Sequence, residues 1–305
     1  MSADKALFEK VLHCPACGGT RFRTWKKGSI DASELRPEAF LITDHHYGLT
    51  WDLARCGDCG HVFADPCPTP AFIESLYGAL RDPLYEEEAG GRAMNFRRVL
   101  VRLERLRPEK GRLFDVGAAT GILMDQAKER GWEVDGVEPS AWAVAFARDR
   151  YGLAIRRGIF ETAAVPAASV DVVTMVDLIE HTARPYDAVR RAADVLRPDG
   201  LLCIVTPDIR SVAARLTGRT WWHYRPAHLA YFTRRSLDAL LSRAGFTVIR
   251  RRSYSWTFSA RYLASRKPAF RFLARGRLAS FLGRIPIRLA LGDSFEIYAR
   301  KDGSR

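Results

Sequence analysis

The stretch Asp115-Val-Gly-Ala-Ala-Thr-Gly121 decides the fold. It follows an apolar run that begins at Leu113 and precedes a helical pattern that begins at Ile122, so it is the turn between a strand and a helix. Its glycines let the backbone turn tightly and approach a ligand without a Cβ in the way. The helix behind it presents free N–H groups and positive potential at its N-terminus. By itself, this turn indicates only a nucleotide-like ligand.

Around this turn, residues 112 to about 206 alternate short apolar runs with longer helical patterns. Such alternation predicts a Rossmann-like α/β fold, in which helices cover both faces of a mainly parallel sheet. Ligands of these sheets bind beyond the carboxyl ends of the strands. We predict strands at 113–117, 133–138, 170–176, 201–206, 246–252 and 294–301. We predict helices at 122–130, 141–151, 186–196 and 236–244, and two earlier helices between Pro70 and residue 107.

Two details near the turn argue against a dinucleotide as the ligand. Asp115 lies two residues before the first glycine, where a carboxylate would repel a pyrophosphate. Ala119 replaces the middle glycine, so no full G-x-G-x-x-G motif is present. At the end of the next predicted strand, Glu138 is placed to accept hydrogen bonds from the two hydroxyls of a ribose.

These residues resemble the core of the class I S-adenosylmethionine-dependent methyltransferases, especially the group that includes the ubiquinone-biosynthesis O-methyltransferases. The similarity includes 115–121, Gly136-Val-Glu138, the strand and turn at 170–181, and Leu196-Arg-Pro-Asp-Gly200. It implies a seven-stranded sheet that binds S-adenosylmethionine. The residues implied in binding are Asp115, Gly117, Ala118 and Gly121 at the methionine part, Glu138 and Pro139 at the ribose, Phe160 and Glu161 at the adenine, and Asp177 and Leu178 beside the sulfonium.

Four cysteines form two C-x-x-C pairs, Cys14-Pro-Ala-Cys17 and Cys56-Gly-Asp-Cys59. Two such pairs complete a tetrahedral, structural Zn²⁺ site, and we predict a zinc-ribbon module at 1–68, with free thiols as the alternative. Cys67 and Cys203 are expected to be buried and to take no part. Between the pairs, Asp44-His-His-Tyr47 and Trp51 are either a cover for an acceptor pocket or a solvated loop.

A hydroxyl acceptor of a methyl group usually needs a base to remove its proton. The candidates are His181, one turn beyond the strand at 170–176, and His223, Tyr224 and His228 in an aromatic loop. His181 is the first choice because it stands at the carboxyl end of the sheet; the alternative is a histidine that caps the following loop or helix. His228 is otherwise a packing residue between Trp222 and Phe232.

The net charge of +13 is concentrated near the C-terminus, where residues 243–305 hold 15 Lys and Arg against 3 acidic residues. Within this region, residues 257–290 mix arginines with large apolar side chains, as an amphipathic insertion would. The insertion would contact anionic lipid, grip a phosphorylated or lipid-linked acceptor, or pack on the core with its arginines in water. Without a leader-like or membrane-spanning pattern, we expect a cytoplasmic chain, with the inner membrane face as a peripheral site.

Together these features predict an S-adenosylmethionine-dependent methyltransferase acting on a small molecule or on a glycan or lipid precursor, at oxygen. The predicted organisation is the module at 1–68, a helical lead-in at 69–111 and the methyltransferase domain at 112–305. One rival is a ribosomal or transfer RNA methyltransferase that grips RNA with its zinc module and basic surface. Against it, the basic residues are expected to avoid the zinc module, and the strand at 170–176 is not followed by an Asn/Asp-Pro-Pro-aromatic motif. A second rival is a non-enzymatic binding protein on the same fold.

Overall fold

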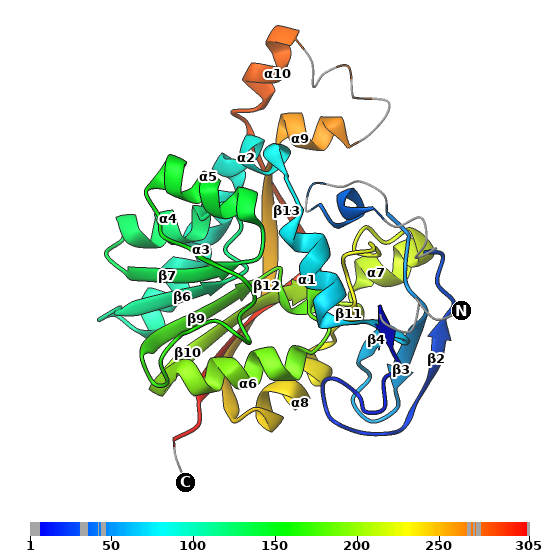
Figure 1. Ribbon diagram of the computed structural model, residues 1–305. Helices are drawn as coiled ribbons and strands as arrows, with labels where there is room; N and C mark the ends of the chain where they lie inside the picture. The colour runs from blue at the N-terminus through cyan, green and yellow to red at the C-terminus, as the bar shows by residue number, and fades with distance from the viewer. Residues whose placement is uncertain are drawn as a thin grey trace.

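A seven-stranded sheet forms the centre of the molecule (Figure 1). The computed structural model describes residues 7–30, 36–41, 43, 47–266, 270, 272 and 276–303. The strands are β6 (Arg112–Val116), β7 (Glu133–Glu138), β8 (Arg156–Arg157), β9 (Val170–Val176), β10 (Leu196–Pro207), β12 (Phe246–Ser259) and β13 (Pro286–Lys301). Their order is β12-β13-β10-β9-β6-β7-β8, in which β10 to β8 are parallel and β13 is antiparallel to both its neighbours. The predicted Rossmann-like sheet is confirmed.

Helices cover both faces of this sheet. The helices α3 (Ala89–Leu106) and α4 (Ile122–Glu129) share a buried cluster with Val172 of β9 on one face. On the other face, α6 (Pro185–Val195) and α8 (Arg234–Arg243) share a cluster with Val173. Neighbouring residues of a strand point to opposite faces, and β9 is buried on both, so its sequence is apolar along nearly its whole length. The helix α5 (Ala141–Tyr151) contacts β7 and β8.

The N-terminal part forms a second, four-stranded antiparallel sheet that is joined to the rest of the chain. It contains β2 (Phe22–Lys26), β3 (Leu53–Cys56), β4 (Val62–Ala64) and, from far downstream, β11 (Ala230–Tyr231). A short pair, β1 (Phe8–Glu9) and β5 (Cys67–Pro68), lies beside it, and η3 (Pro37–Phe40) precedes β3. Because β11 completes the sheet, the predicted module does not have a core of its own: Phe40 and Leu53 share one buried cluster with Trp221 and Leu229.

Trp51 belongs to this shared core and is not a cover for a pocket. Its side chain is buried, and its indole N–H donates to the carbonyl of Pro226 over 2.8 Å. The other part of that prediction, residues 44–46, lies outside the described residues.

A helical segment crosses from the small sheet to the large one. It consists of α1 (Pro70–Gly78) and α2 (Pro83–Glu87), followed by α3. Thr69 caps α1, because its side chain accepts a hydrogen bond from the backbone N–H of Phe72, and Pro70 occupies the first turn. In Figure 1, α1 stands between the two sheets. Three short helices, η4 (Ile179–His181), α7 (Val212–Thr217) and η5 (Gly218–Thr220), complete the connections.

The basic region at 257–290 is the far end of a long hairpin. β12 continues to Ser259 and β13 begins at Pro286, so both ends of the predicted insertion are paired strands. The helices α9 (Ala260–Ser265) and α10 (Gly276–Leu282) lie at the end of this hairpin and project beyond the sheet (Figure 1). Among the described residues, no helix is long and apolar enough to cross a membrane.

Candidate active site and metal centre

The turn after β6 forms one wall of a cavity at the carboxyl ends of the parallel strands. Gly117 has a φ of +72°, and a Cβ at this position would lie 2.6 Å from the Leu178 side chain. The N–H groups of Gly117 and Ala118 both donate to the carbonyl of Val137, which holds the turn against β7. The turn therefore approaches the neighbouring loop as closely as its glycine permits.

Glu138, at the end of β7, is fixed by the backbone on both sides of its carboxylate. Its Oε2 accepts a hydrogen bond from the N–H of Ala119 and its Oε1 one from the N–H of Ser140, each over 2.9 Å. Burial raises the pKa of Glu138, and these two hydrogen bonds oppose that rise. Ala119 reaches its position with a φ of +47°, a conformation that favours glycine. The carboxylate lines the cavity with its orientation set before any ligand arrives.

The cavity has a volume of about 330 Å³, and apolar atoms form most of its surface. Its wall also carries six acidic side chains but only one arginine, Arg184. A cavity with this charge favours a cationic ligand and disfavours a pyrophosphate. The acidic residues are Glu74, Asp82, Glu138, Glu161, Asp177 and Asp187.

The residues predicted to bind the cofactor divide into two groups. Seven line the cavity, namely Gly117, Glu138, Pro139, Phe160, Glu161, Asp177 and Leu178. The other three, Asp115, Ala118 and Gly121, lie behind its wall. Gly121 is the N-cap residue of α4 and has a φ of +86°, and a Cβ there would lie 2.8 Å from Leu153, so its small size serves packing.

Asp115 is buried and faces the interior of the sheet. Its Oδ1 accepts a hydrogen bond from the Thr174 hydroxyl over 2.6 Å. Burial raises the pKa of Asp115 to about 7, and the nearby Glu138 carboxylate adds to the rise, while Thr174 opposes it. The side chain thus approaches the ligand region from behind and is not part of the cavity surface.

Of the four predicted bases, only His181 lines the cavity. Its Nδ1 lies 2.7 Å from the hydroxyl of Tyr77, which reaches the same cavity from α1. Burial lowers the pKa of His181 to about 4, so its ring is neutral at pH 7. His228 stands behind it, fully buried, with ring centres 4.6 Å apart. Tyr224 packs in the core of the small sheet, between Trp221 and Tyr231, away from the cavity.

Glu180 precedes His181 and is also buried. Its Oε2 accepts a hydrogen bond from Thr206 over 2.9 Å, and burial and the neighbouring Asp177 raise its pKa well above the usual range. Ligand atoms of Glu180, His181 and His228 lie within 4.8 Å of one another, a spacing that a metal ion could bridge.

The prediction from sequence missed the residues that α1 and α2 contribute. Tyr77, Tyr85 and Trp142 all line the cavity, and the first two come from the lead-in helices. The only signal for Tyr77 was its place near the end of the capped helix that begins at Pro70, which does not show what the helix faces.

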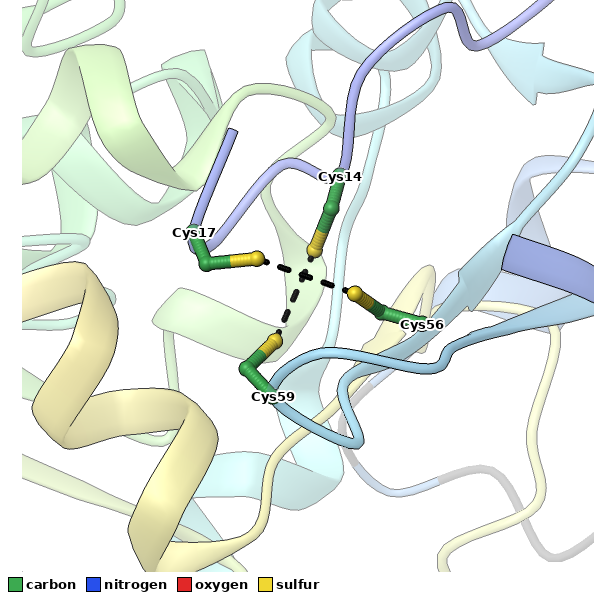
Figure 2. A group of neighbouring side chains, drawn as sticks. All are labelled: Cys14, Cys17, Cys56 and Cys59. Carbon is green, nitrogen blue, oxygen red and sulfur yellow. Dashed lines mark hydrogen bonds between the residues drawn. The ribbon is translucent and has the colours of Figure 1, made fainter. Parts of the chain in front are cut away.

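The four predicted zinc ligands converge on one point (Figure 2). The Sγ atoms of Cys14 and Cys59 are 3.7 Å apart, and those of Cys17 and Cys56 are 3.6 Å apart. A zinc–sulfur bond of about 2.3 Å places the corners of a tetrahedron about 3.8 Å apart, so the geometry fits Zn²⁺. Contact with the Cys14 thiol lowers the pKa of Cys59 to about 5, so the cluster readily holds a thiolate, the form that binds metal. Cys67 and Cys203 are free and buried, as expected.

Comparisons with known proteins agree with this geometry. The family described as a methyltransferase domain matches residues 89–251. The ubiquinone biosynthesis O-methyltransferase of Azorhizobium caulinodans is 30% identical over 154 residues, which cover 46% of this chain and 61% of that protein. The corresponding protein of Ruegeria pomeroyi is 30% identical over 178 residues, or 52% of this chain and 72% of that protein. An S-adenosylmethionine-dependent methyltransferase structure from Archaeoglobus fulgidus shares the fold, with 18% identity, a TM-score of 0.50, and 72% and 100% coverage of the two chains.

Proposed function

The chain belongs to the methyltransferase domain family, and from this premise we propose that it transfers a methyl group from S-adenosylmethionine to an oxygen of a small molecule or of a glycan or lipid precursor. The observation that carries the proposal is the acidic cavity around Glu138. S-adenosylmethionine bears a sulfonium and an ammonium, so a wall with six acidic side chains suits it. The two curated relatives whose names describe O-methylation support oxygen as the acceptor atom.

When bound, S-adenosylmethionine supplies a methyl group on a positively charged sulfur. Glu138 would accept hydrogen bonds from both ribose hydroxyls, because backbone N–H groups already orient its two oxygens. Phe160 and Glu161 would flank the adenine, and Asp177 and Leu178 would lie on the sulfonium side, where a carboxylate stabilises positive charge. Much of the rate would come from holding the acceptor oxygen against the methyl group.

Tyr77 and His181 would remove the proton of the acceptor hydroxyl together. As that proton moves to the Tyr77 oxygen, the tyrosine's own proton would move to Nδ1 of His181 over the 2.7 Å that separates them. The neutral state of His181 leaves a ring nitrogen able to take it, and Asp177 stabilises the resulting imidazolium. His228, behind His181, would hold the ring in place as a packing partner.

The Cys14, Cys17, Cys56 and Cys59 cluster would hold one structural Zn²⁺. Four thiolates leave no open position on the metal, so it would support the fold and not the chemistry. The site joins the loop before β2 to the turn after β3, and its cysteines share a buried cluster with α8 of the large domain.

The end of the β12–β13 hairpin would contact an anionic membrane. It exposes Phe270, Phe272, Leu278 and Phe281, each at least 47% exposed, among basic residues. Replacing Leu278 and Phe281 with Ser should reduce sedimentation with vesicles of 30% phosphatidylglycerol while leaving S-adenosylmethionine binding unchanged. Equal sedimentation of both proteins would exclude this contact.

Labelled transfer tests the function itself. The protein is incubated with methyl-tritiated S-adenosylmethionine and a cell extract, which is then separated into small-molecule, lipid and RNA fractions. We expect label in the small-molecule or lipid fraction, and none with Asp177→Ala. Label in the RNA fraction alone would favour the RNA methyltransferase, and no transfer to any fraction would favour the non-enzymatic alternative.

A further inference from the structure

A second, strongly basic groove lies beside the second cysteine pair, with a volume of about 560 Å³. Its wall includes Cys56 to Gly60 and five arginines, which come from the small sheet and its preceding loop, from the loop after β10 and from α8. The expectation that basic residues avoid the zinc module is therefore wrong. We call this feature the arginine groove, and its arginines are Arg21, Arg23, Arg55, Arg210 and Arg235.

Most of this charge is not neutralised by the protein. Arg21 forms an ion pair with Asp58, the acidic residue of the groove. The other four arginines form no ion pair within the part of the chain that the structure describes, and all four are exposed. The nearby carboxylates already have partners, because Asp58 pairs with Arg21, and Asp208, beside Arg210, also pairs with Arg234. An anion in the groove would still gain from the four exposed arginines.

Two of these arginines are held directly opposite each other. Arg23 of β2 and Arg55 of β3 are register partners in the antiparallel pair, where like charges repel and destabilise the strands. The turn that carries the second cysteine pair fixes this register. The N–H of Gly57 donates to the carbonyl of Arg21 over 2.8 Å, and the N–H of Cys56 donates to the carbonyl of His61 over 2.9 Å. An anion between the two guanidinium groups would remove this repulsion.

The remaining arginines are positioned by the large domain. Arg210 follows β10, and its backbone N–H donates to Asp208 over 2.9 Å. Arg235 lies in the first turn of α8, which begins at the Thr233 capping box. Because β11 and α8 pack against the module, the groove exists only when the two parts of the chain are joined.

We propose that the arginine groove binds a diphosphate group, such as that of a nucleotide-linked or lipid-linked precursor. Guanidinium groups bind phosphate oxygens in bidentate pairs, and four unpaired arginines exceed the charge of one diphosphate. A nucleic acid fits less well, because single strands bind on exposed aromatic side chains. The aromatic residue among the described lining residues is Phe22, whose ring packs edge-on against Phe63 at 5.3 Å. This proposal goes beyond methyl transfer and does not depend on it.

Calorimetry on the full chain at low salt tests the proposal, with inorganic pyrophosphate as the probe. The groove variant is the double substitution Arg23→Gln and Arg55→Gln. Its control is Arg105→Gln with Arg300→Gln, which removes the same charge from two exposed arginines elsewhere. We expect the wild type and the control to bind pyrophosphate alike and the groove variant to bind at least about tenfold more weakly. One zinc per chain and a thermal midpoint no lower than that of the wild type establish that the groove variant is folded.

Further ligands separate the sources of the diphosphate. Tighter binding of uridine diphosphate than of pyrophosphate supports a nucleotide carrier, and tighter binding of farnesyl diphosphate supports a lipid carrier. A loss of affinity that is equal in both variants, or no binding of pyrophosphate, overturns the proposal. The proposal is also overturned if the wild type binds a short single-stranded RNA more tightly than pyrophosphate and the groove variant loses this RNA binding, because the groove would then serve nucleic acid. S-adenosylmethionine binding by the same samples shows separately whether the proposed function stands.

Discussion

Replacing Glu138 with Gln changes the charge of one buried side chain and little else. Two backbone N–H groups now donate to the carboxylate, and a glutamine would turn its NH₂ group toward one of them. The bound cofactor would lose one charge-assisted hydrogen bond, worth about 1.5–3 kcal/mol, and would meet a side chain in a poorer orientation. We expect a total loss of about 3 kcal/mol, or about 100-fold in Kd.

Isothermal titration calorimetry with S-adenosylmethionine measures this loss. The control is Glu133→Gln at the opposite end of β7, where the side chain is 74% exposed and the charge change is the same. A control that binds like the wild type separates a local effect from a general one. If Glu138→Gln binds within about threefold of the wild type, the ribose role of Glu138 is refuted.

Three further predictions follow from contacts elsewhere in the chain. Tyr77→Phe should keep S-adenosylmethionine affinity but slow methyl transfer about 100-fold or more, because it breaks the proton path to His181. The control is Tyr151→Phe, which removes a hydroxyl that donates to Glu86, and a Tyr77→Phe rate equal to that of the control would remove Tyr77 from the mechanism. Cys59→Ser should lower the zinc content measured by mass spectrometry from about one per chain to none, while Cys67→Ser keeps it; zinc retained by Cys59→Ser would contradict a four-cysteine site. Asp115→Asn should gain stability relative to the wild type as the pH rises from 4 to 8, by up to about 4 kcal/mol. The reason is that Asp115 ionises at a pKa of about 7 in the folded wild type but near 3.8 in the unfolded chain. Urea unfolding at both pH values measures the difference in unfolding free energy between the two proteins, and a difference that does not change with pH would refute the raised pKa.

The sequence predicted what depends on local periodicity. The strand at 170–176 has the bounds that its apolar pattern indicates, and the helix predicted at 186–196 lies one residue from α6, because a buried parallel strand and an amphipathic helix each bury a face that neighbours in sequence define. The cysteine pairs were equally clear, since C-x-x-C spacing is set within four residues.

What the sequence did not reveal depends on contacts between distant segments. The spacing places Asp115 at the end of β6, but only the packing shows that its side chain turns to Thr174 and away from the cavity. Tyr77 faces the cavity because α1 crosses between the sheets, and Arg23 meets Arg55 because of a strand register that no local pattern specifies. The strand predicted at 246–252 continues as β12 to Ser259. The end was misplaced because three consecutive arginines interrupt the apolar pattern before the hairpin.

The central claim is that the acidic cavity around Glu138 binds S-adenosylmethionine and not a dinucleotide. Equilibrium dialysis with labelled S-adenosylmethionine, with and without an excess of NAD, tests it directly. We predict one bound S-adenosylmethionine per chain and no displacement by NAD, because the acidic wall disfavours a pyrophosphate. No binding of S-adenosylmethionine, or its displacement by NAD, would contradict the claim.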